Sequence, residues 1–102
     1  MATINEALWE LRETYRAEPN PERKQLLQDE YDRALSAVLE MADKDIGENT
    51  AAFDKAVEGL DKSIAALRQA KRDLGDVAKA IKNVAKAVDA IVKVAAKIVS
   101  LL

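Results

Sequence analysis

The sequence predicts an all-α protein, a small antiparallel bundle of three to four helices. Apolar residues recur at intervals of three and four along most of the chain, which is the spacing of one helix face. Its three glycines and two prolines are few and stand mainly between such stretches. Only 4% of the residues are aromatic, so the core must come mainly from Leu, Ile, Val and Ala. We expect one helical domain over 1–102. Its helices are expected at approximately 4–17, 21–45, 50–74 and 76–102.

The first two helices have clear boundaries in the sequence. Thr3 followed by Glu6 is a capping-box pattern that starts the first helix. Pro19 ends it, because the residue before a proline is pushed out of the helical region. Asn20 is then a good N-cap, with Pro21 at the first helical position. The apolar side of the second helix is predicted to hold Leu27, Tyr31, Ala34, Leu35, Val38, Leu39 and Ala42.

The third stretch has the most regular spacing. Its apolar positions are Phe53, Val57, Leu60, Ile64, Leu67 and Leu74. Gly59 lies off this seam, at a position that would let a neighbouring helix approach closely. Gly75 and Asp76 leave two alternatives, a turn between two helices or one long kinked helix that continues to the end. A glycine costs only ~1 kcal/mol in a helix, so it gives no more than a slight preference for the turn.

The stretch 77–102 is the most strongly amphipathic part of the chain. Its predicted apolar interaction face consists of Ile81, Val84, Val88, Ile91, Val92, Ile98 and Leu102. Lysines occupy the opposite side, namely Lys79, Lys82, Lys86, Lys93 and Lys97. Burying one Val or Ile side chain is worth ~1.5–3 kcal/mol, so we expect other helices to cover the apolar face.

Charge is divided unevenly along the chain. Residues 1–76 carry 11 Lys/Arg and 17 Asp/Glu, a net charge of −6, whereas residues 77–102 carry five Lys and one Asp, a net charge of +4. The simplest explanation of this uneven charge is that acidic helices lie beside the basic helix within the molecule. The lysines could also contact an anionic surface.

Residue types argue against an enzyme, and no catalytic residue, cofactor or small-molecule substrate is predicted. The chain has no histidine and no cysteine, which removes the commonest general base and the usual transition-metal ligands. The acidic segment 43–48 fails the register of a calcium loop, since a loop starting at Asp43 has Glu48 where glycine is required. We therefore predict no metal site.

Two functions agree with these observations. The preferred one is a non-enzymatic helical interaction or structural protein, which forms a homo-oligomer or docks a helical protein partner through apolar helix faces. Trp9 lies off the apolar stripe of its helix and is a candidate partner anchor. The alternative is a membrane-active or membrane-surface protein that uses the cationic amphipathic helix 77–102. Nucleic acid is not an expected partner, because the chain is not basic overall and its basic stretch has no arginine.

The expected compartment is the cytoplasm. The first residues lack the positively charged and apolar regions of a secretory signal. No run of the sequence has the length and hydropathy of a membrane-spanning helix. Leaderless export remains open as an alternative.

Overall fold

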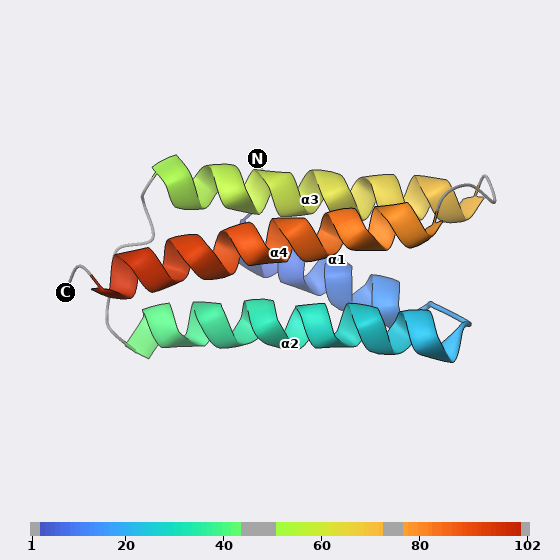
Figure 1. Ribbon diagram of the computed structural model, residues 1–102, viewed down its shortest axis with the longest axis horizontal. Coiled ribbons are helices and arrows are strands. Elements are labelled where there is room, and N and C mark those ends of the chain that lie inside the picture. The colour runs from blue at the N-terminus through green and yellow to red at the C-terminus, as the bar shows by residue number, and fades with distance from the viewer. Residues whose placement is uncertain (1–2, 44–50, 73–76, 101–102) are drawn as a thin grey trace.

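The structure, a computed structural model, describes residues 3–43, 51–72 and 77–100 and contains four helices in them (Figure 1). They are α1 (Ile4–Arg16), α2 (Pro21–Asp43), α3 (Ala51–Arg72) and α4 (Val77–Ser100). The all-α helical bundle predicted from the sequence is confirmed.

The last two helices are separate. α3 and α4 pack against each other and run in opposite directions, which excludes one long helix through both (Figure 1). Gly75 and Asp76, at which a turn was expected, lie outside the described residues, as does the connection at 44–50.

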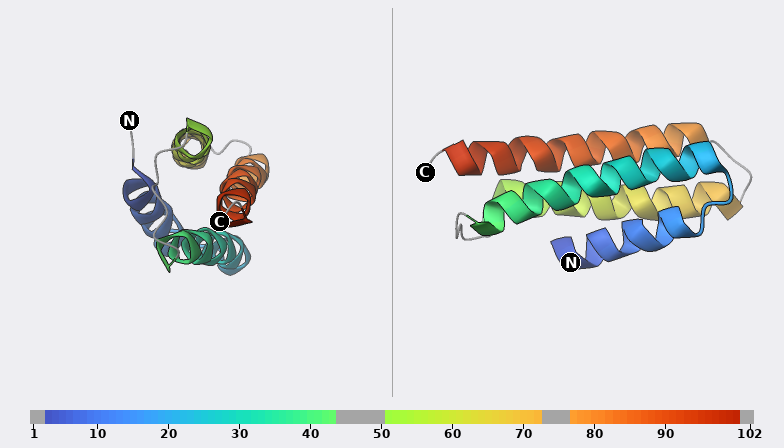
Figure 2. Two further views of the ribbon diagram at one scale, coloured as in Figure 1. Left: turned by 90° about the vertical axis from the view of Figure 1, so that its left-hand side faces the viewer. Right: turned by 90° about the horizontal axis from the view of Figure 1, so that it is seen from below.

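The helices form two hairpins packed side by side. α1 contacts α2 and α3, and α4 contacts the same two helices, so the order around the bundle is α1, α2, α4, α3 (Figure 2). Helices consecutive in the chain are antiparallel, as predicted. Across the hairpins, however, α2 runs parallel to α4 and α1 runs parallel to α3 (Figures 1 and 2). The bundle measures 45 × 23 × 18 Å.

Both predicted N-caps are present. The Thr3 hydroxyl oxygen accepts a hydrogen bond of 3.2 Å from the backbone N–H of Glu6. The Asn20 side-chain oxygen accepts from the backbone N–H groups of Glu22 and Arg23, at 3.0 and 3.1 Å. Between the two helices, the buried Glu18 side chain accepts a 3.2 Å hydrogen bond from the Asn20 N–H, which fixes the turn that joins α1 to α2.

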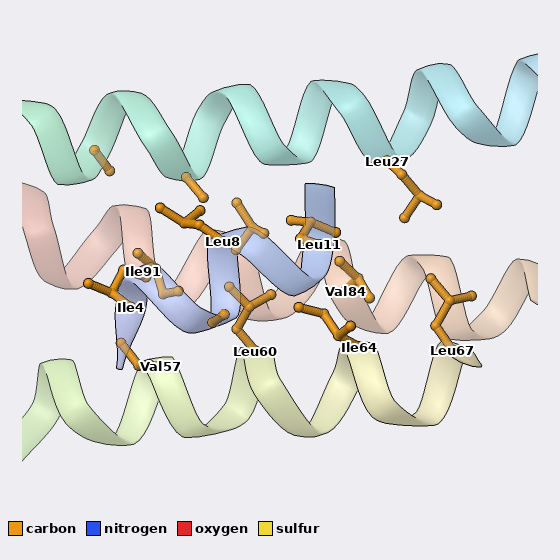
Figure 3. Close-up of a cluster of buried hydrophobic side chains, with 14 of the residues drawn as sticks. Ile4, Leu8, Leu11, Leu27, Val57, Leu60, Ile64, Leu67, Val84 and Ile91 are labelled. Atoms are coloured by element: carbon orange, nitrogen blue, oxygen red, sulfur yellow. The ribbon is translucent and has the colours of Figure 1, made fainter. Parts of the chain in front are cut away.

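The core lies along the axis of the bundle and is filled by aliphatic side chains of all four helices (Figure 3). On α4, the side chains of Val84, Val88 and Ile91 are fully buried. They lie among Ile4, Leu8 and Leu11 of α1, Leu27 of α2, and Val57, Leu60, Ile64 and Leu67 of α3. The expectation that other helices cover the Val/Ile side of α4 is therefore confirmed.

The prediction for Leu39 was wrong. It was placed on the apolar side of α2 but is 55% exposed. The cause is the length of α1, which has 13 residues against the 23 of α2. Starting from the turn that joins them, α1 covers only ~20 Å of its neighbour, and Leu39 lies near the far end of α2.

A close helix approach at Gly59 is also not found. A Cβ built on this residue meets nothing within 4 Å, so the packing does not require glycine there. The position borders a shallow groove of about 500 Å³ between α3 and α4, lined mainly by small side chains that include Ser63, Ala66 and Ala87.

Candidate interaction site

The predicted apolar interaction face of α4 turns inward. Ile81, Val84, Val88 and Ile91 are buried in the core of the single molecule, and Val92 and Ile98 are half-buried. Leu102 lies outside the described residues. A partner could reach the four buried side chains only after the bundle opened, so a docking surface for the closed bundle must lie elsewhere.

Trp9 lies on the outer side of α1 and is 56% exposed. The side chains of α1 that enter the core lie on the opposite side of the helix, and they include Ile4, Ala7, Leu8 and Leu11. Within α1, the positions three, four and seven residues from Trp9 are Asn5, Glu6, Arg12, Glu13 and Arg16. This Trp9 face therefore combines the only tryptophan of the chain with two exposed arginines.

The other aromatic side chains pack inside the molecule. Phe53 is 3% exposed and belongs to the core. Tyr15 of α1 and Tyr31 of α2 are half-buried and contact each other, with ring centroids 5.6 Å apart and planes inclined by 55°. The aromatic group that the fold leaves outside is thus that of Trp9.

α1 is held to α3 by a polar cluster. Arg68 of α3 forms an ion pair of 2.5 Å with Glu10 and donates a 3.2 Å hydrogen bond from Nε to the hydroxyl of Thr14. Thr14 is buried and donates in turn to the backbone oxygen of Glu10, at 2.7 Å. These bonds fix the orientation of α1, and with it the direction in which Trp9 points.

The five lysines of α4 are all exposed. They are Lys79, Lys82, Lys86, Lys93 and Lys97, and their spacing places them along one outer line of the helix. Asp89 follows Lys82 by seven residues and interrupts this series of positive charges.

Asp89 is paired with Arg33 of α2, which also forms an ion pair of 3.0 Å with Glu30. The hydrogen bond from Arg33 lowers the pKa of Asp89 below its usual value, and the positive charge of Lys93 adds to the shift. The same hydrogen bond raises the pKa of Arg33. α2 lies beside the basic helix α4. In this ion pair, however, α2 supplies the arginine and α4 supplies the carboxylate, the reverse of the expected pairing of an acidic helix with the basic one.

A groove of about 370 Å³ runs between α2 and α4 beside this ion pair. Its apolar part is formed by Ala37, Val92, Ala95 and Ala96, and its polar edge includes Arg33 and Glu40. Leu26, which lies seven residues before Arg33 on the same side of α2, is 54% exposed. Sequence reasoning missed Leu26, although a Leu-Leu pair in a helix is itself a signal, since only one of two adjacent residues can point directly into the core.

Two further properties of the described residues bear on function. Among them, no group of three or more Asp, Glu, His or Cys side chains is placed to hold a metal ion. None of the helices, as far as each is described, has the length and hydropathy needed to cross a bilayer.

Comparison of the chain with protein-family models, curated proteins and solved structures gave no match.

Proposed function

We propose that this chain is a non-enzymatic helical protein that acts by docking a partner protein, and that the Trp9 face of α1 is the docking surface. The observation that carries the proposal is the 56% exposure of Trp9 on a bundle whose core is already filled by other side chains. Folding alone gives no reason for a tryptophan at this position.

The composition of the face supports this proposal. Tryptophan and arginine are the residue types most enriched among those that dominate binding energy in protein interfaces. Arg12 and Arg16 are exposed beside Trp9, and their aliphatic stems can pack around an indole ring. The surface therefore suits a partner that offers an apolar pocket for the ring and carboxylates for the guanidinium groups.

The rigidity of α1 also favours binding. Its orientation is fixed by its core residues and, beside them, by the contacts of Arg68 with Glu10 and Thr14. A surface that is already ordered loses less conformational entropy when a partner binds.

The experiment immobilises three chains, namely the wild type, Trp9→Ala and Leu39→Ala, and compares the proteins that each of them captures. Leu39 is a matched control, because it is 55% exposed and lies away from α1. Trp9→Ala should weaken capture of a partner by about tenfold or more, since truncating an interface hot spot costs at least ~2 kcal/mol. Leu39→Ala should capture it as well as the wild type. If Trp9→Ala, folded by circular dichroism, captures the same proteins equally well, the proposal is wrong.

A membrane-active protein is the second candidate. The outward line of lysines on α4 favours it, because anionic lipids attract clusters of exposed basic residues by about 1 kcal/mol each. Insertion of the apolar side of α4 would require the helix to leave the bundle. The test is flotation with anionic and with neutral vesicles, comparing the wild type with Lys86→Glu. Equal behaviour with both kinds of vesicle would remove this candidate.

A further inference from the structure

The outer face formed by α3 and α4 contains a shallow groove of about 500 Å³ between the two helices. Most of its lining consists of small side chains, and Lys62 on α3 and Lys86 on α4 supply its positive charge. Among the described residues, no acidic side chain contributes to the lining. We call the lining residues the α3/α4 groove, namely Gly59, Lys62, Ser63, Ala66, Asn83, Lys86 and Ala87.

Gly59 leaves open space in this groove that the fold does not use. A Cβ built on Gly59 meets nothing within 4 Å, so packing inside the molecule does not require a glycine. A glycine in the interior of a helix nevertheless costs ~1 kcal/mol relative to alanine. Ser63, one turn later, donates its hydroxyl hydrogen to the Gly59 carbonyl oxygen at 2.8 Å, which holds the side chain against α3. Together the two positions allow the backbone of another chain to approach closely.

Lysines continue along both sides of the groove. Lys55 precedes Lys62 by seven residues on α3, and Lys97 follows Lys86 by eleven on α4, so each pair lies on one line of its helix. All four are exposed. Because α3 and α4 are antiparallel, Lys55 and Lys97 lie towards the same end of the groove (Figure 1). We call these two pairs the lysine rows.

The aspartates described in α3 and α4 belong to other faces. Asp61 precedes Arg68 by seven residues, and Arg68 contacts α1, so Asp61 lies on the α1 side of α3. Asp54 is seven residues before Asp61 and follows the same line. Asp89 of α4 is turned towards α2, where it pairs with Arg33. These three carboxylates therefore lie away from the lysine rows.

Glu58 is nearer to the groove and forms an ion pair of 3.2 Å with Lys62. Both side chains are exposed, and an ion pair between exposed residues contributes at most ~1 kcal/mol to stability. Lys62 can therefore exchange Glu58 for a carboxylate of a bound partner at little cost.

We propose that the α3/α4 groove binds one α-helix of a partner protein, an amphipathic helix with acidic residues on both sides of its contact seam. A helix laid along the groove brings its seam over Gly59, where the absent side chain lets the two backbones approach. Acidic residues seven apart in that helix recur every ~10 Å, as Lys55 and Lys62 do. Carboxylates of the partner and the lysine rows thus remain in register along the groove.

The composition of this face favours a helix over a lipid surface or a nucleic acid. The large apolar side chains exposed among the described residues are those of Trp9, Leu26 and Leu39, which belong to α1 and α2, so α3 and α4 offer no such anchor for a bilayer. The groove and the lysine rows include no arginine or aromatic residue, the types that commonly contact phosphates and bases.

This inference goes beyond the proposed function, because it concerns a different face. Trp9 lies on the outer side of α1, and the described residues of α1 and α4 make no contact with each other. Trp9→Ala should leave binding in the groove unchanged. Docking through Trp9 and docking through the groove can therefore fail independently.

The first test measures binding of a labelled helical peptide to the intact chain by fluorescence anisotropy. The peptide has three heptads, about 21 residues, with Ala and Leu on its seam and Glu on both sides of it. We expect saturable binding at low salt that weakens about tenfold or more at high salt, because ions screen exposed charges. A peptide with Lys in place of Glu should not bind. If the Glu peptide shows no saturable binding up to millimolar concentration, the proposal is wrong.

Gly59→Leu tests whether the partner occupies the groove. The leucine side chain fills the space over which the partner backbone passes, so the Glu peptide should bind about tenfold more weakly or worse. The variant should keep the helical circular dichroism of the wild type, because its Cβ meets no atom within 4 Å. Ala65→Leu is the control, since it adds a leucine at an exposed position of α3 outside the groove. Equal binding by Gly59→Leu and Ala65→Leu would contradict the proposal.

A charge-reversed chain tests the lysines. Lys62→Glu/Lys86→Glu should lose the Glu peptide and bind the Lys peptide instead, because every pair across the interface is then again of opposite charge. Lys24→Glu/Lys82→Glu is the control, with the same change in net charge. Lys24 is on α2, and Lys82 precedes Asp89 by seven residues and so lies towards α2. If the reversed chain does not exchange its preference, or if the control exchanges it too, the groove lysines do not select the partner.

Other occupants of the groove give different results. Polyglutamate of the same charge, a single-stranded oligonucleotide and anionic vesicles should each bind at least about tenfold more weakly than the Glu peptide, since they lack its helical period. Equal binding of any of them that Lys62→Glu/Lys86→Glu abolishes would mean that the groove takes anions of that class, and would overturn the proposal. Self-association of the wild type that Gly59→Leu abolishes would assign the groove to a second copy and overturn it as well.

Discussion

Arg33 of α2 donates a hydrogen bond to the Asp89 carboxylate of α4, across 56 positions of sequence. The pair joins two parallel helices that belong to different hairpins, and it sets their relative height. The positive charge of Arg33 also offsets the negative charge of Asp89, the residue that interrupts the lysine line of α4. One side-chain contact thus contributes both to the packing of the fold and to the charge of its surface.

The stabilising effect of this pair should depend on pH. Pairing lowers the pKa of Asp89 below its ordinary value of 3.8, so its contribution is present above that value and is lost as the pH falls through the folded-state pKa. Asp89→Asn should therefore unfold at a lower urea concentration than the wild type at neutral pH, and the difference should disappear in strong acid. Urea titrations at both pH values measure it. A difference that persists in acid, or one shared by the control Asp54→Asn on the exposed side of α3, would contradict this explanation.

The Arg68 cluster should couple α1 to α3. Arg68→Ala removes an ion pair to Glu10 and a hydrogen bond to the buried Thr14, and should lower the free energy of unfolding by about 1–2 kcal/mol. The control Lys55→Ala, at an exposed position of α3, should change it by less than ~0.5 kcal/mol. In a double-mutant cycle with Glu10→Gln, we expect a coupling energy of about 0.5–1 kcal/mol. Strict additivity would mean that the ion pair contributes nothing.

Gly59→Ala should stabilise the protein. A Cβ at this position meets no atom within 4 Å, so alanine adds helix propensity without a steric penalty. The expected gain in the free energy of unfolding is ~1 kcal/mol. The reverse change at the exposed position Ala65, Ala65→Gly, should cost about as much. A loss of stability in Gly59→Ala would show that α4 approaches α3 more closely here than the structure has it.

The local features of this fold could be predicted from sequence, because they depend on residues close together in the chain. Thr3 and Asn20 cap helices through hydrogen bonds to residues two or three positions away. Val84, Val88 and Ile91 were assigned to one face by helical periodicity alone, and they are buried. Such patterns state which side of a helix is apolar, but not which helix covers it.

The exposure of Leu39 and the partner of Asp89 could not be predicted, because both depend on how the helices are arranged in space. Leu39 is exposed because the short helix α1 does not extend to its position on α2. The sequence of α2 does not indicate the length of α1. The partner of Asp89 depends on the order of helices around the bundle. That order brings α2 beside α4, and nothing in either helix's own periodicity requires it. The Arg33–Asp89 pair could not be recognised until this neighbour relation was known.

The shelter of the Val/Ile side of α4 by the other helices is tested most directly by one pair of variants on that helix. Ile91 is fully buried, and Lys86 is exposed five residues earlier. Thermal unfolding of Ile91→Asp should show loss of the cooperative transition, because a buried unpaired charge costs several kcal/mol, a large part of the stability of a small domain. Lys86→Glu should melt within a few degrees of the wild type. An Ile91→Asp protein that melts like the wild type would contradict the burial of this side of α4.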